Sequence, residues 1–119
     1  MRTAVIKAFE GLGREEPDSY VSADPENDAF TLRMLVGSRD TEGLESFDVL
    51  VCTPGWLVGE VREHGPQVGR HLLIMDVLDL VQAQAFLRER VEQISAPTWS
   101  EVAEKVARLG SWELEDFSD

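Results

Sequence analysis

Histidine and cysteine are the residues of this chain that could serve as a base or a nucleophile, and they are His64, His71 and Cys52. A catalytic histidine needs a nucleophile and an orienting acid beside it, and neither histidine has such neighbours in the sequence. Cys52 ends an apolar segment, where a free cysteine usually packs as a small hydrophobe. A reactive thiolate stays open as the alternative, because a helix is expected to begin at Pro54. We therefore expect no catalytic residue.

Metal and phosphate sites are disfavoured by residue spacing. One cysteine and two histidines do not form the paired ligands of a zinc site. Asp24, Glu26 and Asp28 alternate as calcium ligands can, but the turn glycine and the bidentate glutamate of an EF-hand are missing at their offsets. The glycines of residues 11–13 lack the lysine and third glycine of a phosphate-binding loop. The sequence predicts no cofactor and no metal.

The charge balance points to a class of partner. The chain has 23 acidic and 11 basic residues, a net charge of −12. Nucleic acids and anionic membranes bind positive charge, so neither is expected as a partner. An acidic surface attracts a cationic partner and accelerates the encounter, although solubility alone is the alternative explanation. A lone cysteine, no signal-peptide pattern and no apolar run near the ~20 residues of a membrane span predict a cytoplasmic protein.

Two acidic segments supply the candidate partner-binding residues. Residues 15–28 contain six acidic residues, two prolines and no base. The C-terminal tail alternates acidic with apolar and aromatic residues. Aromatic residues among acids suit an interface that anchors by burial and steers by charge, with core packing as the alternative for the tail tryptophan. The candidates are Glu15, Glu16, Asp18, Asp24, Glu26, Asp28, Trp112, Glu113, Glu115, Asp116 and Phe117.

Alternating apolar residues predict the strands that must position these segments. Residues 3–9, 30–36 and 47–52 have the period of two that is typical of strands, and a glycine-bounded link makes the last two a hairpin. The polar residues Thr31, Arg33 and Asp48 would lie on its less buried face. The dense apolar run at residues 71–77 predicts a fourth strand that is covered on both faces.

Capping residues predict three helices. Thr53 and Pro54 favour the start of a short helix. Asp79 with Gln82, and Thr98 with Glu101, have the spacing of capping boxes, and each pair precedes an apolar helical stripe. The sequence thus predicts one α+β domain over residues 1–119. It would have a mainly antiparallel sheet of about four strands packed against two longer C-terminal helices plus one short helix.

Three sequence blocks, taken in order, resemble a known family. They are FDVLVCTPGWL at 47–57, GRHLLI at 69–74, and WSEV at 99–102 leading to SWELEDF at 111–117. This order is similar to that of the immunity protein 8 (Imm8) family of bacterial polymorphic toxin systems, over about residues 30–117. The resemblance implies an α+β protein that binds a cognate toxin and blocks its active site or an adjacent surface. It implies no catalytic residue.

The charge and the resemblance together give the leading hypothesis. It is an immunity protein that neutralises a cognate toxin by occluding its active surface, and the acidity suggests a basic toxin such as a nuclease. One alternative is an acidic interaction module or adaptor with an unrelated partner. Another is a small enzyme or ligand-binding domain, which a deep pocket at His71 or Cys52 would support. The sequence leaves open whether the protein is a monomer or a homodimer.

Overall fold

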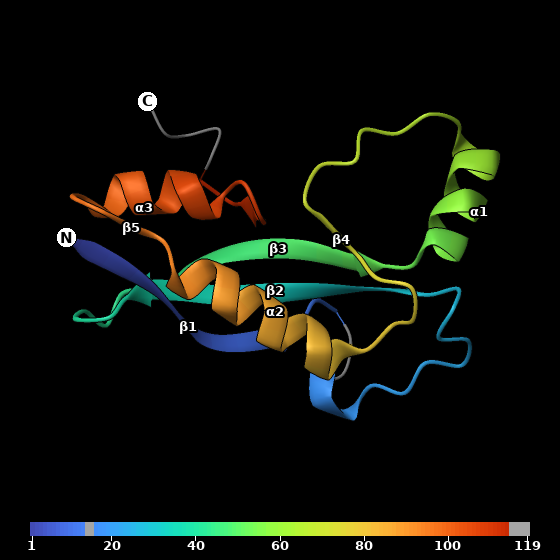
Figure 1. Ribbon diagram of the computed structural model, residues 1–119, viewed down its shortest axis with the longest axis horizontal. Coiled ribbons are helices and arrows are strands. Elements are labelled where there is room, and N and C mark those ends of the chain that lie inside the picture. The colour runs from blue at the N-terminus through green and yellow to red at the C-terminus, as the bar shows by residue number, and fades with distance from the viewer. Residues whose placement is uncertain (14–15, 115–119) are drawn as a thin grey trace.

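Among the residues that the computed structural model describes, 1–13 and 16–114, six strands form one curved sheet (Figure 1). They are β1 (Arg2–Gly11), β2 (Ala29–Ser38), β3 (Glu45–Cys52), β4 (Leu72–Ile74), β5 (Ser95–Ala96) and β6 (Ser111–Trp112). The strand order is β4-β3-β2-β1-β5, and β6 pairs with the same edge of β3 as β4 does. Only β3 and β4 run parallel, since they are joined by a helical crossover.

Two of the described helices cover one face of this sheet, and a third lies beyond its end. They are the short 3-10 helix η1 (Pro17–Ser19), α1 (Pro54–His64), α2 (Leu80–Glu92) and α3 (Trp99–Val106). Figure 1 shows α2 and α3 lying across one face, whereas α1 stands beyond the ends of β3 and β4. The predicted helix starts are confirmed: Thr53 and Asp79 each accept a backbone hydrogen bond as N-caps, and Thr98 with Glu101 forms a complete capping box.

The core lies between the sheet and the two packed helices. Every second residue of β2 and β3 is buried there, and α2 and α3 bury the predicted stripes. On the opposite face Arg33 Nε donates to Asp48 Oδ1 at 2.8 Å, which confirms the predicted polar face. This hydrogen bond to the carboxylate raises the pKa of Arg33 above its ordinary value.

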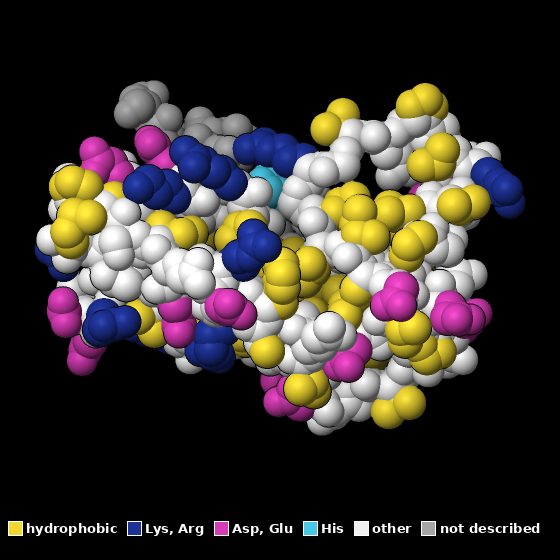
Figure 2. Space-filling model, in the orientation of Figure 1, with side chains coloured by type: hydrophobic (Ala, Val, Ile, Leu, Met, Phe, Trp, Pro, Cys, Tyr) yellow, Lys and Arg dark blue, Asp and Glu magenta, His cyan; other side chains and the backbone are white. Residues whose placement is uncertain are grey.

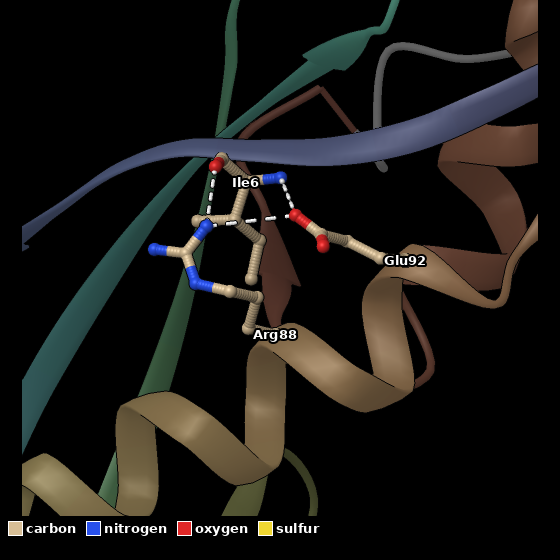
Figure 3. Close-up of polar contacts among 3 residues, drawn as sticks. All are labelled: Ile6, Arg88 and Glu92. Atoms are coloured by element: carbon tan, nitrogen blue, oxygen red, sulfur yellow. Dashed lines mark hydrogen bonds and ion pairs between the residues drawn. The ribbon is translucent and has the colours of Figure 1, made fainter.

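Side chains of α2 cover the part of β1 that has no strand on the edge away from β2 (Figure 3). β5 pairs with β1 only at Arg2 and Thr3, so the backbone of Ile6 lies at an open edge. Ile6 N donates to Glu92 Oε2 at 3.3 Å, and Arg88 Nη1 donates to Ile6 O at 2.9 Å. These contacts fix α2 across β1.

The α+β class is confirmed, but three details of the prediction are wrong. The described sheet has six strands instead of about four, because β5 and β6 have two residues each and are too short to show a period. α1 has 11 residues and α3 has 8, so the first helix is not the short one. The fourth strand spans only Leu72–Ile74, because His71 adopts a φ of 62° just before it and the chain bends at Asp76 and Val77 after it. It is not covered on both faces as predicted, since Ile74 is 55% exposed.

Candidate partner-binding surface

Negative charge is concentrated where α1 stands. Residues 16–28 and 54–79, which we call the acidic end, contain nine acidic and two basic residues. This third of the chain therefore carries a net charge of −7 out of −12. In Figure 1 both segments lie at the α1 side of the molecule, and in Figure 2 most of the visible Lys and Arg side chains lie toward the α3 side. The two ends of the molecule thus present different electrostatic surfaces.

Hydrogen bonds from three other parts of the chain hold the acidic loop, residues 16–28, in place. Thr53, which caps α1, donates its backbone N–H to Asp28 O and accepts from Asp28 N through Oγ1, each at 3.2 Å. Leu78 N, in the link before α2, donates to Pro25 O at 2.7 Å. Gln84 Nε2 of α2 donates to Asp18 Oδ1 at 2.9 Å. The loop is irregular, as predicted, but its course is fixed.

Gly55 allows α1 to approach this loop closely. A Cβ at this position would lie 2.7 Å from the backbone oxygen of Glu26, closer than real Cβ contacts allow. Three successive residues therefore form the junction between α1 and the loop. Thr53 caps α1, Pro54 is its first residue, and Gly55 leaves room for the loop backbone. One of the family-like sequence blocks thus joins the acidic loop to α1.

The structure separates the loop candidates into two groups. Glu16, Asp18, Asp24 and Glu26 are exposed. Asp28 is half-buried, and its carboxylate accepts hydrogen bonds from Tyr20 Oη at 2.6 Å, Ser22 Oγ at 2.6 Å and Ala29 N at 2.8 Å. The carboxylate of Asp28 therefore joins parts of the loop to one another. Glu15 lies outside the described residues.

Two further acidic residues, Asp76 and Asp79, belong to the same surface and were not among the sequence candidates. Both are exposed, and the Leu78–Pro25 hydrogen bond joins their segment to the loop. The sequence signal that could have suggested them is their position directly after the apolar run of β4. Their position beside the loop, however, depends on the contact between Leu78 and Pro25, which are far apart in the chain.

The tail candidates occupy a different place. Trp112 is 8% exposed in β6, and its ring stacks on Phe47 with centroids 6.0 Å apart. This is the core packing that the sequence left open as the alternative. Glu113 is exposed and directly follows β6, which pairs with the first half of β3, whereas α1 follows the last residues of β3. Glu115, Asp116 and Phe117 lie outside the described residues.

The residues considered for chemistry have apolar or cationic surroundings. His71 lines an open hollow of about 410 Å³ together with Arg70 and Arg108, and its Nε2 lies 2.7 Å from Ala107 O. The rest of that lining is apolar or glycine, with no carboxylate, hydroxyl or thiol. Cys52 is fully buried, and this burial raises the pKa of its thiol. A protonated, enclosed thiol is a poor nucleophile.

Residues 1–13 and 16–114 contain neither a metal-binding cluster nor a membrane-spanning helix. Within them no cluster of three or more histidine, cysteine or acidic side chains is arranged to bind a metal ion. The helices of this part of the chain are too short and too polar to cross a membrane.

Comparisons with known proteins identify the family. No curated protein sequence and no solved structure matches the chain. The family model described as immunity protein 8, Imm8, matches residues 4–117, which is nearly the whole chain. This confirms the resemblance seen in the three sequence blocks, and it extends over the acidic loop and all three helices. The chain therefore belongs to the Imm8 family of immunity proteins, whose members act against toxins.

Proposed function

We propose that this Imm8 protein binds a cognate bacterial toxin in the cytoplasm through its acidic end and so covers the toxin's active surface. The observation that carries this proposal is the net charge of −7 gathered on segments that hydrogen bonds fix in one place. A charged surface that is already ordered loses little conformational entropy on binding. It also accelerates the encounter with a partner of opposite charge.

The acidic end favours a basic toxin, and a nuclease fits best. An enzyme that holds a phosphate backbone does so with lysine and arginine side chains. Exposed carboxylates can occupy the same side chains and thereby exclude the nucleic acid. The residues proposed to meet the toxin are Glu16, Asp18, Asp24, Glu26, Asp76 and Asp79, all of which are exposed.

A pull-down from lysate of the source bacterium tests this function, with the protein as bait and salt as the eluent. We expect one basic toxin domain, whose activity falls to zero when one equivalent of this protein is added. A captured partner without toxic activity would instead favour the adaptor alternative. A toxin that binds the bait but keeps its full activity in the complex would contradict neutralisation by occlusion.

A further inference from the structure

Helix α1 lacks the buried face that a helix in a folded domain normally has. None of its 11 residues is buried. Leu57, Val58 and Val61 have the spacing that places apolar side chains on one side of a helix, and Val58 is 47% exposed. Most helices in proteins are stabilised by packing such a stripe against a core. The apolar side of α1 is therefore open to a partner.

The neighbouring strand and helix extend this apolar surface. Ile74 of β4 is 55% exposed, and Val77, Val81 and Phe86 are also exposed. Figure 2 shows hydrophobic side chains gathered where Figure 1 places α1, β4 and the first half of α2, with acidic side chains beside them. We call the residues Leu57, Val58, Val61, Ile74, Val77 and Phe86 the anchor surface.

An open hollow lies within the anchor surface, between β4 and α2. It measures about 220 Å³ and is lined by Leu73, Ile74, Met75, Gln82, Ala83 and Phe86. Small-molecule sites are usually larger, at roughly 300–1,000 Å³. A hollow of this size and apolar lining suits one or two side chains of a protein partner.

The sequence of β4 supports the same conclusion. Its unbroken apolar run is typical of a strand that is covered on both faces, yet β4 lies at the end of the strand order and leaves Ile74 exposed. β4 has only three residues, and a very short strand is itself a protection against edge pairing, so the open feature here is the side chain of Ile74 and not the strand edge. The side of β4 that carries Ile74 is therefore open in the part of the chain that the structure describes.

We propose that the anchor surface receives an apolar segment of the toxin that is flanked by basic side chains. This inference rests on the proposed function and adds the part of the interface that holds the complex together. Charge decides the occupant: on the side of α1 and β4 the anchor surface lies within the acidic end, where nine acidic residues accompany two basic ones. At Phe86, outside that end, a cation does lie over the surface, since the Arg90 guanidinium is 4.8 Å from the ring centroid. A second copy of this chain would bring two such ends together and be repelled.

The anchor surface and the acids should affect different rate constants. Charges at the rim of an interface mainly set the association rate and its salt dependence, whereas buried apolar contacts mainly set the dissociation rate. The double variant Ile74→Ala/Val61→Ala should therefore speed dissociation of the toxin roughly tenfold or more. Its association rate and salt dependence should stay close to those of the unchanged protein.

The test measures the association and dissociation rates of the purified toxin by stopped-flow or surface plasmon resonance, at two salt concentrations. Leu44→Ala is the matched control, because Leu44 is 49% exposed, similar in size to Ile74 and located just before β3, at the opposite end of the sheet. Thermal unfolding shows whether each variant is folded. The single variant Val58→Ala, on an exposed position of α1, is the second variant if the double variant does not fold.

The outcomes separate this inference from the proposed function. Faster dissociation from the anchor variants, with Leu44→Ala unchanged, supports the anchor surface. The anchor surface is overturned if every anchor variant dissociates at the rate of the unmutated protein. The proposed function still stands in that case, provided that the unmutated protein inhibits the toxin. A dimer of the free protein that Ile74→Ala dissociates would show that a second copy covers the surface and would also overturn the inference. Failure of the unchanged protein to inhibit the toxin overturns the proposed function itself.

Discussion

Thr53 is the residue on which the acidic end depends most directly. It is fully buried, it caps α1 by accepting from Trp56 N at 3.3 Å, and it hydrogen-bonds the backbone of Asp28. Thr53→Ala should lower the free energy of unfolding by about 2 kcal/mol, because it removes the side-chain cap of α1 and the hydroxyl contact to Asp28 N. Urea denaturation measures this loss. Thr53→Ser keeps the hydroxyl, so a serine variant as unstable as the alanine variant would contradict this role.

Cys52 links the stability of the core to pH. Its pKa is higher in the folded chain than in the unfolded chain because the thiol is buried, so folding favours the protonated form. The resulting stability is present below the ordinary thiol pKa of about 8.5 and is lost as pH rises through the folded pKa. Thermal unfolding between pH 8 and pH 10 should therefore show a larger loss of stability for the unchanged protein than for Cys52→Val. Parallel curves for the two proteins would contradict this account.

Among the elements, α1 should be less stable locally than α2. No residue of α1 is buried, whereas α2 buries Leu80, Ala83, Leu87 and Val91. Native-state hydrogen exchange should show the amides of α1 opening at a lower free energy than those of α2, and toxin binding should protect them. Equal protection of both helices in the free protein would mean that α1 is held by contacts other than buried side chains.

The sequence predicted the elements whose signals are local. The caps at Thr53 and Thr98 and the stripe of α2 depend on neighbouring residues, so their positions are confirmed. The alternation of the tail allowed a short edge strand or an extended docked segment, and β6 at Ser111–Trp112 is such a strand, at the edge of β3. β5 exists because β1 offers it an edge, and its two residues carry no period. For the same reason the sequence did not show that β4 pairs parallel to β3 and has an open edge.

The candidate site could be predicted only in part, because exposure is decided by tertiary contacts. The acidic loop was recognised from its composition, and four of its candidates are exposed. Composition could not tell that Asp28 turns toward Tyr20 and Ser22, or that Trp112 stacks on Phe47. Asp76 and Asp79 join the loop through a hydrogen bond between Leu78 and Pro25, which no sequence period indicates.

At the scale of the whole molecule, the distribution of charge matters more than its total. A net charge of −12 spread evenly would serve solubility, but −7 of it lies on one third of the chain. That end also carries the exposed apolar side chains of α1 and β4. Charge that steers and apolar area that anchors thus lie side by side, which is the arrangement expected of a surface that captures a basic protein.

The association rate of the toxin with two matched charge variants tests this most directly. Asp24→Asn/Glu26→Gln removes two exposed acids from the acidic end, and Asp40→Asn/Glu42→Gln removes two with the same spacing from the exposed loop between β2 and β3. Both variants have the same net charge. The first should slow association at low salt roughly threefold or more and flatten its salt dependence, while the second should change it little. Equal effects of the two variants, or no effect of the first, would contradict binding through the acidic end.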